Sequence, residues 1–189
     1  LIPIIDADNK KSLELAQQTI DTFPSKFERA YNEGASKKLG LETSETDDVL
    51  LMTDLLDTMA DQHADFTLVF RRLSGLDVEP GPEDDTVREL FDDPAAFDAW
   101  ARRWRARLKR QGGDPSLRRE RMASVNPAYI PRNHRVEEVI RAAEDHGDLA
   151  PFYQLHEVLR NPYHEQPEHI AFQTPPRPEE VVRATFCGT

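Results

Sequence analysis

The sequence predicts an all-α protein. Apolar residues recur mainly three or four positions apart, strand-like alternation is nearly absent, and Asp-Pro pairs typical of helix starts occur twice. The chain of 189 residues is long enough for one well-buried core, because a domain of this size removes roughly 70% of its unfolded surface from water. We expect a helical domain over residues 1–160 and a Pro-rich strap and tail over residues 161–189.

Composition and charge limit the classes of partner. Hydrophobic residues make up 38% and charged residues 31% of the chain, and the mean hydropathy is −0.67. No apolar run approaches the roughly 20 residues that a membrane-spanning helix needs. The net charge of −11 repels phosphate backbones and anionic lipid headgroups. We therefore expect neither nucleic acid nor a membrane as a partner.

Two helices are predicted on either side of Pro24, which ends or kinks the first of them. Asp6 and Asp8 offer caps for the first helix, and Gly40 stops the second. The apolar start at Leu1, without a cap, suggests a sequence cut from a longer one. The residues at helical spacing are Leu13, Ala16 and Ile20 before the proline, and Phe27, Ala30, Tyr31, Gly34 and Leu39 after it.

The middle of the chain predicts two helices and then a loop. Acidic residues around Asp47 favour a helix start there, and apolar residues mark a core-facing helix from Val49 to Met59. Asp65 caps a short helix from Phe66 to Leu73. The segment 77–85 carries the turn signals of a loop.

The second half predicts four helices and a segment without a long helix. Asp93-Pro94 and Asp114-Pro115 begin two of the helices, and Asn126-Pro127 stops the second. The predicted helices run from Pro94 to Gly112, from Pro115 to Met122, from Asn133 to His146 and from Leu149 to Arg160. Five prolines then indicate an extended strap, with Tyr163, Ile170 and Phe172 as anchors and a short helical turn at 179–183.

The helix from Pro94 combines aromatic residues with arginines. Phe97, Trp100, Trp104 and Leu108 line one face, and six basic residues fill much of the rest. A helix that stacks bases and neutralises phosphates would have this composition, but the net charge of −11 argues against it. We therefore predict a buried aromatic face and a solvated arginine face.

Other motifs have simpler structural explanations. Asp65-Phe66-Thr67 resembles the metal-binding Asp-Phe-Gly of kinases, but the helical spacing continues through it and favours a cap. The segment 164–169 lacks the second His of a zinc-protease motif, and its proline breaks the helix that the motif needs. The acidic run 83–85 lacks the spacing of a calcium loop and indicates a solvated turn.

The remaining histidines predict no site, because none has a partner at metal-ligand spacing. We expect His63, His134, His146 and His156 to be exposed or hydrogen-bonded. Taken alone, the residues of this chain show no catalytic, cofactor-binding or metal-ligating centre.

Four sequence blocks together resemble the C-terminal region of the selenoprotein O (SelO) family, and the resemblance spans almost the entire chain. The blocks are F-x-x-x-Y-N-E-G and K-K-L-G-L within Phe27–Leu41, L-L-D-T-M-A and A-D-F-T within Leu55–Thr67, R-M-A-S-V-N-P-A-Y-I-P-R-N-H at Arg121–His134, and N-P-Y-H-E-Q-P-E at Asn161–Glu168.

The resemblance implies part of a protein adenylyltransferase. Members of the family have a pseudokinase fold that holds ATP inverted relative to ordinary kinases, and they transfer AMP to Ser, Thr or Tyr hydroxyls of proteins with Mg or Mn. The residues that hold ATP and metal belong to earlier portions of such a chain, so no catalytic, cofactor or metal residue transfers here. The implied role is structural and regulatory, as the helical end of a kinase-like lobe whose partners are the rest of the catalytic domain and protein substrates.

Cys187 is the one residue to which the resemblance assigns a role. It is the only cysteine, so a disulfide within the chain is impossible. It stands third from the C-terminus, where relatives have selenocysteine or cysteine, although Gly-Thr replaces the usual Ser-Ser after it. The implied role is redox control through a disulfide to the catalytic region, and a free surface thiol is the alternative. The family implies a cytoplasmic protein in bacteria and a mitochondrial one in eukaryotes.

A second functional class stays open, a stand-alone helical interaction module without catalysis. In that case the Trp100 helix and the acidic loop 77–85 would form the partner surface. Cooperative unfolding of the chain alone would favour the module, whereas exposed apolar surface would favour a piece of a larger lobe.

Overall fold

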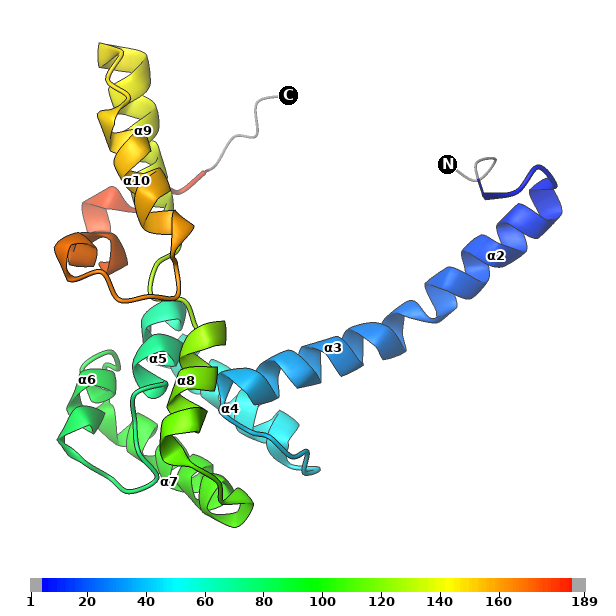
Figure 1. Ribbon diagram of the computed structural model, residues 1–189, viewed down its shortest axis with the longest axis horizontal. Coiled ribbons are helices and arrows are strands. Elements are labelled where there is room, and N and C mark those ends of the chain that lie inside the picture. The colour runs from blue at the N-terminus through cyan, green and yellow to red at the C-terminus, as the bar shows by residue number, and fades with distance from the viewer. Residues whose placement is uncertain (1–4, 185–189) are drawn as a thin grey trace.

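Helices make up the secondary structure of residues 5–184, the range that the computed structural model describes, and no strand occurs within it, as predicted. Three parts can be followed in Figure 1: a body formed by α4 to α8, an arm formed by α2 and α3, and a pair of helices, α9 and α10, at one end of the body. The helices are α2 Asn9–Asp21, α3 Phe23–Lys38, α4 Asp48–Asp61, α5 Phe66–Leu73, α6 Asp85–Arg88, α7 Pro94–Gln111, α8 Pro115–Val125, α9 Asn133–His146 and α10 Ala150–Arg160.

Aspartate side chains cap the helices where the sequence predicts them. In each case the carboxylate accepts a hydrogen bond from a backbone amide of the first turn, which has no partner inside the helix. The caps are Asp8 on α2, Asp65 on α5, Asp93 on α7 and Asp114 on α8. Gly147 ends α9 in the left-handed conformation, with a φ of 66°.

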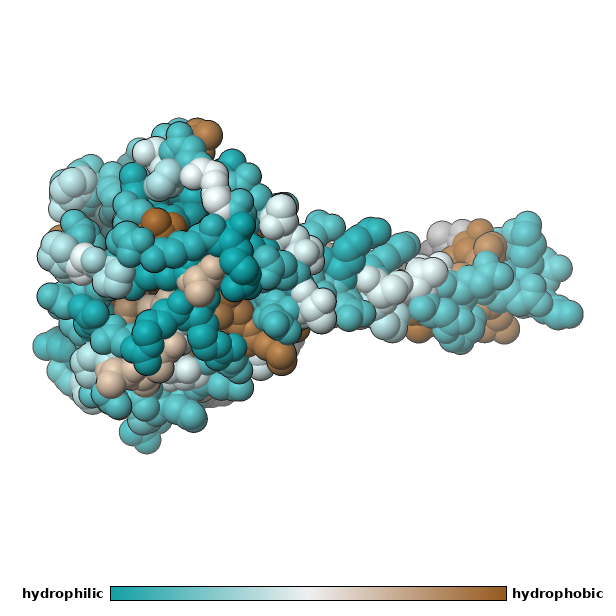
Figure 2. Space-filling model, turned by 90° about the horizontal axis from the view of Figure 1, so that it is seen from below, coloured by the Kyte–Doolittle hydropathy of each residue, from teal (hydrophilic) through white to brown (hydrophobic). Residues whose placement is uncertain are grey.

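The arm projects from the body and exposes most of its surface. Pro24 lies in the first turn of α3, where its missing amide hydrogen leaves no helical bond unmade. Eight residues between Leu13 and Leu39 are predicted at helical spacing from the sequence. Among these eight, Leu39 alone belongs to the main core of the described chain. Figure 2 shows the arm extending away from the body with hydrophobic residues on its surface.

Helix α7 packs into the main core with its aromatic face buried, which confirms that prediction. The Trp100 indole donates a hydrogen bond to the Leu51 carbonyl at 2.8 Å, and the Trp104 indole donates one to the Leu39 carbonyl at 2.9 Å. The two rings stack with their centroids 5.8 Å apart. These contacts hold α7 against α4 and against the end of α3.

The predicted solvated arginine face of α7 is wrong at two positions. Arg105 is buried and pairs with Asp84, whose side chain is only 1% exposed, so the acidic run 83–85 is not a fully solvated turn. Arg107 is buried against Asp48, with distances of 2.7 Å from Nε to Oδ1 and 3.1 Å from Nη2 to Oδ2. The physical reason is that α4 and α6 both pack on α7. Together they cover more of the α7 surface than its apolar residues occupy, so that arginines beside the apolar face are buried as well.

The residues after α10 pack beside the α9–α10 pair. They form 3₁₀ turns at Pro167–Gln173 and Pro178–Glu180, the second in place of the turn predicted at 179–183. Phe172 packs on a small cluster around Tyr129 and Val158. The predicted anchors Tyr163 and Ile170 are exposed instead, because backbone and polar contacts fix this segment.

Replacing Trp104 with alanine should destabilise the protein by about 3–5 kcal/mol, because it empties a fully buried site and leaves the Leu39 carbonyl unpaired. Urea unfolding followed by circular dichroism measures the loss. Arg102→Ala, at an exposed position of the same helix, is the matched control and should change stability by less than about 0.5 kcal/mol. An unchanged midpoint for Trp104→Ala would contradict the burial of this ring.

Candidate functional site

Polar side chains from distant parts of the sequence meet where α3, α5 and α8 approach the residues after α10. We call this cluster the junction. Its members are Lys38, Asp65, Arg71, Asn126, Tyr129, Arg132, Glu165 and Gln166. Each of the four sequence blocks contributes at least one of these residues.

Asn126 is fully buried at the centre of the junction. Its Nδ2 donates to the Lys38 carbonyl at 3.0 Å and to Ser74 Oγ at 3.1 Å, and its Oδ1 accepts from Lys38 Nζ at 3.1 Å. Helix α8 ends just before Asn126, because the residue that precedes Pro127 is disfavoured in the helical conformation. The side-chain amide thus joins the ends of α3, α5 and α8.

The Lys38 ammonium lies against neutral groups. It is 5.0 Å from the centre of the Phe70 ring and 5.5 Å from that of Phe66, in addition to its hydrogen bond with Asn126. Burial lowers the pKa of Lys38 from its ordinary value. Its contacts therefore hold the cation in place by hydrogen bonds and aromatic faces.

Arg71 connects the body to the residues after α10. Its Nη1 donates to the carbonyls of Ala123, Asn126 and Tyr163 at 3.1–3.2 Å, and its Nε lies 2.7 Å from a carboxylate oxygen of Glu165. One guanidinium thereby holds three chain segments. Arg71 is not among the predicted site residues, because nothing in its local sequence distinguishes it from other arginines at helix ends.

Asp65 combines two roles at the start of α5. One of its oxygens accepts from the Leu68 amide, as predicted for a helix cap, and Arg132 binds both oxygens at 2.8 and 3.0 Å. Burial alone raises the pKa of Asp65, but the hydrogen bonds from Arg132 and the Leu68 amide outweigh it and leave the pKa below its ordinary value. Asp65 is therefore a cap and an ion-pair partner.

The residues after α10 are fixed mainly through main-chain atoms. The Pro162 carbonyl accepts from the amides of Ala128 and Tyr129 at 2.8 and 3.1 Å. The Tyr129 hydroxyl donates to the Gln166 carbonyl at 2.7 Å and accepts from the Gln166 amide at 3.1 Å. This tyrosine therefore sets the path of the segment that leads toward the C-terminus.

The histidines do not gather into a centre. Between residues 5 and 184, no group of three or more His, Cys, Asp or Glu side chains is placed to hold a metal ion. His63 lies 2.9 Å from Asp92. For His134 the expectation is wrong: its side chain is buried, and neither ring nitrogen has a hydrogen-bond partner in the described chain. Packing of the first turn of α9 encloses this ring, and burial lowers its pKa.

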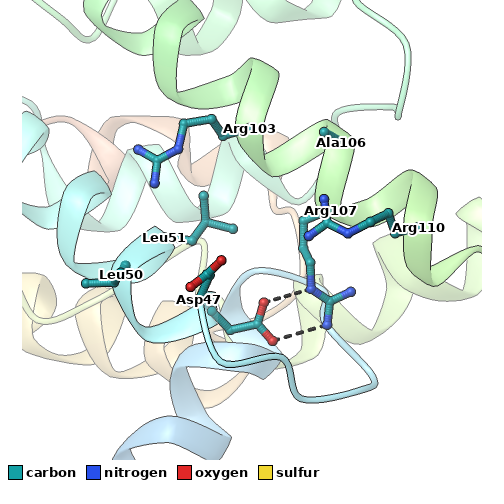
Figure 3. Close-up of a pocket in the computed structure, with 8 residues that line it drawn as sticks. Asp47, Leu50, Leu51, Arg103, Ala106, Arg107 and Arg110 are labelled. Atoms are coloured by element: carbon teal, nitrogen blue, oxygen red, sulfur yellow. Dashed lines mark hydrogen bonds and ion pairs between the residues drawn. The ribbon is translucent and has the colours of Figure 1, made fainter.

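A hollow of about 360 Å³ lies between α4 and α7 (Figure 3). Arg103, Arg107 and Arg110 point toward it, but each already has a carboxylate partner, respectively Asp54, Asp48 and Glu45. Because these carboxylates neutralise the guanidinium groups, the hollow is a poor site for an anion. We assign it no ligand.

Two further predictions concern the redox role of Cys187 and the absence of a membrane-spanning helix. Cys187, the predicted redox residue, lies outside the described residues. In the range 5–184, no helix combines the length and apolar character required to cross a membrane.

Comparison with known proteins identifies relatives along the whole chain. The family model described as "Protein adenylyltransferase SelO" matches residues 3–160. Proteins named "Protein nucleotidyltransferase YdiU" are similar over the full chain, with 51% identity in Rhodopseudomonas palustris strain BisB5, 47% in Bradyrhizobium diazoefficiens and 46% in Methylorubrum extorquens. The chain spans 38–39% of the length of these relatives.

The Asp65–Arg132 pair should make stability depend on pH. A carboxylate whose pKa is lower in the folded state stabilises the fold above its unfolded pKa of about 4, and this contribution disappears as the pH falls through the folded pKa. Asp65→Asn, which retains a capping side chain, should therefore lower the free energy of unfolding by about 1.5–3 kcal/mol at pH 7 and by less below pH 3.

Urea unfolding between pH 2 and pH 7 measures this difference. Asp57→Asn, at an exposed position within α4 and away from its last turn, is the matched control and should stay within about 0.5 kcal/mol of the unmodified protein at every pH. A constant difference between Asp65→Asn and the unmodified protein over the whole range would show that the charge of Asp65 does not stabilise the fold.

Proposed function

Because the chain belongs to the SelO family of protein adenylyltransferases, we propose that it is part of an enzyme that transfers AMP from ATP to Ser, Thr or Tyr hydroxyls of proteins. The observation that carries this proposal is the family match over residues 3–160, together with full-length similarity to proteins named as nucleotidyltransferases. The transfer would form a bond between the substrate oxygen and the α-phosphorus and release pyrophosphate.

The part of the enzyme that this chain forms would have a structural and regulatory role. Asp65, Arg71 and Asn126 join chain segments to one another, which supports a bracing role for the junction. Residues 1–160 would form the helical end of a kinase-like lobe, and residues 161–189 would be a strap that carries Cys187. ATP and Mg or Mn would bind to residues of the intact enzyme that lie outside this chain.

The partners follow from the same proposal. They are the remainder of the enzyme's own catalytic domain and its protein substrates, with neither nucleic acid nor a membrane. We place the protein in the cytoplasm, because the relatives that it matches are bacterial.

The alternative of a stand-alone interaction module has weaker support. It uses Trp100 and the acidic loop as a partner surface, but Trp100 is buried and Asp84 is enclosed with Arg105. Many of the exposed large apolar residues lie instead on the arm and on the α9–α10 pair. Exposed apolar surface of this kind favours a piece of a larger lobe.

The intact protein should transfer radioactivity to proteins from ATP labelled at the α-phosphate and not from ATP labelled at the γ-phosphate. Gel autoradiography with magnesium or manganese present distinguishes this reaction from phosphorylation. The 189-residue chain is the control and should transfer neither label, because the nucleotide site would lie elsewhere. Transfer from the γ-phosphate would contradict the proposed reaction, and AMP transfer by the 189-residue chain would contradict the location of the site.

Cys187 of the intact protein should form a disulfide under oxidising conditions. Peptide mapping without reductant should find the Cys187 peptide linked to a cysteine outside this chain, and dithiothreitol should release it. AMP transfer should change on oxidation of the unmodified protein and stay constant in Cys187→Ser. A free thiol at Cys187 after oxidation, or an equal response of both proteins, would assign no redox role to this residue.

A further inference from the structure

One face of the arm carries apolar and small residues in a heptad pattern. Steps of three and four residues alternate along it, which is the spacing that faces a partner helix in helical packing. We call this face the seam. Its residues are Leu13, Ala16, Ile20, Phe23, Phe27, Ala30 and Gly34.

The large residues of the seam are open to water. Leu13, Ile20, Phe23 and Phe27 are 55–63% exposed, and together they form an apolar strip along the arm. The Phe23 and Phe27 rings stack on each other with their centroids 5.8 Å apart. Apolar surface left in water is unfavourable in proportion to its area, and an exposed strip of this kind marks an interaction site.

Gly34 provides an independent indication that something covers the seam. Glycine inside a helix is less stable than alanine because it loses more backbone freedom on folding, so its presence in α3 calls for a reason. A positive φ is not the reason, since Gly34 is not among the described glycines with positive φ. A Cβ at Gly34 would meet no atom of the described chain within 4 Å, whereas one at Gly40 would lie 2.6 Å from Met122 Sδ. A backbone that approaches α3 closely from outside the described chain explains the glycine.

We propose that the seam is the docking surface for a helix supplied by the part of the same polypeptide outside these 189 residues. This inference rests on the proposed function, in which the chain is part of a larger enzyme. The chain spans 38% of the length of its relative in Rhodopseudomonas palustris strain BisB5. A protein as long as this relative has enough sequence outside the 189 residues to supply the helix. The family model matches from residue 3 onward, so the arm lies within the region that the family model covers.

A second copy of this chain is the alternative occupant. An antiparallel pair of arms centred between Phe23 and Phe27 would place Gly34 opposite Ala16 of the other copy. Two identical arms would then cover each other, whereas a helix of the same polypeptide covers the seam without a second chain. The linked peptides and the mass of the crosslinked product distinguish these two occupants.

Photo-crosslinking in the intact protein identifies the occupant. With p-benzoylphenylalanine in place of Phe27, irradiation should link this position to a peptide of the same polypeptide outside the 189 residues, at the mass of a single chain. Mass spectrometry of the linked peptides gives the assignment. A link to a second copy, to a different protein or to residues of this chain would overturn the proposal, and so would the absence of any link.

Charge substitutions provide a second test with a matched control. Ile20→Glu places a carboxylate in the seam, and Leu15→Glu places one at an exposed apolar position of the same helix outside the seam. In the intact protein, Ile20→Glu should speed proteolytic cleavage within the arm by about tenfold or more, because a buried unpaired charge favours the undocked arm. Leu15→Glu should leave the rate unchanged. Equal rates for the two variants would overturn the proposal.

These readouts separate this inference from the proposed function. If the intact protein crosslinks as expected but transfers no AMP, the proposed AMP transfer is wrong and the proposed docking surface is supported. An active enzyme whose arm stays uncrosslinked would refute the docking surface alone.

Discussion

The arrangement of this protein depends on the buried side-chain amide of Asn126. At this position α8 must stop before Pro127, and the chain turns toward α9. The Lys38 carbonyl, at the end of α3, has no acceptor role inside its own helix and receives a hydrogen bond from Asn126 instead. A buried polar group without a partner costs roughly 1–3 kcal/mol, so this amide fixes three helix ends in one geometry. Asn126, Arg71 and the Asp65–Arg132 pair together attach the residues after 126 to the body.

Much of the helical fold could be predicted from the sequence, because the signals involved are local. A cap such as Asp65 or Asp93 contacts an amide only two or three residues away, and the Trp face of α7 follows from periodicity. The buried arginines could not be predicted in the same way. Arg107 and Asp48 are 59 residues apart in sequence, and their burial depends on how widely other helices cover α7.

The junction was only partly visible in the sequence. The blocks that resemble the family contain Asn126 and Arg132, but their sequence gives no indication of which groups they bind. Arg71 lies outside every block, although it contacts three carbonyls. Tyr163 and Ile170 failed as predicted anchors because main-chain hydrogen bonds, such as those to the Pro162 carbonyl, hold that segment. Such bonds leave no pattern in the side chains.

The contrast between the junction and the arm has a physical cause. A buried polar group needs a partner with defined distance and direction, so polar contacts such as those of Asn126 and Arg71 must be completed within the unit that buries them. Apolar area has no directional requirement and can be covered later by any surface of matching shape. A chain region with a largely paired polar junction and an exposed apolar arm is consistent with our proposal that it forms one side of a larger lobe. In that proposal, the contact with the rest of the lobe runs along α2 and α3, where Phe23 and Phe27 face water, and not through the junction.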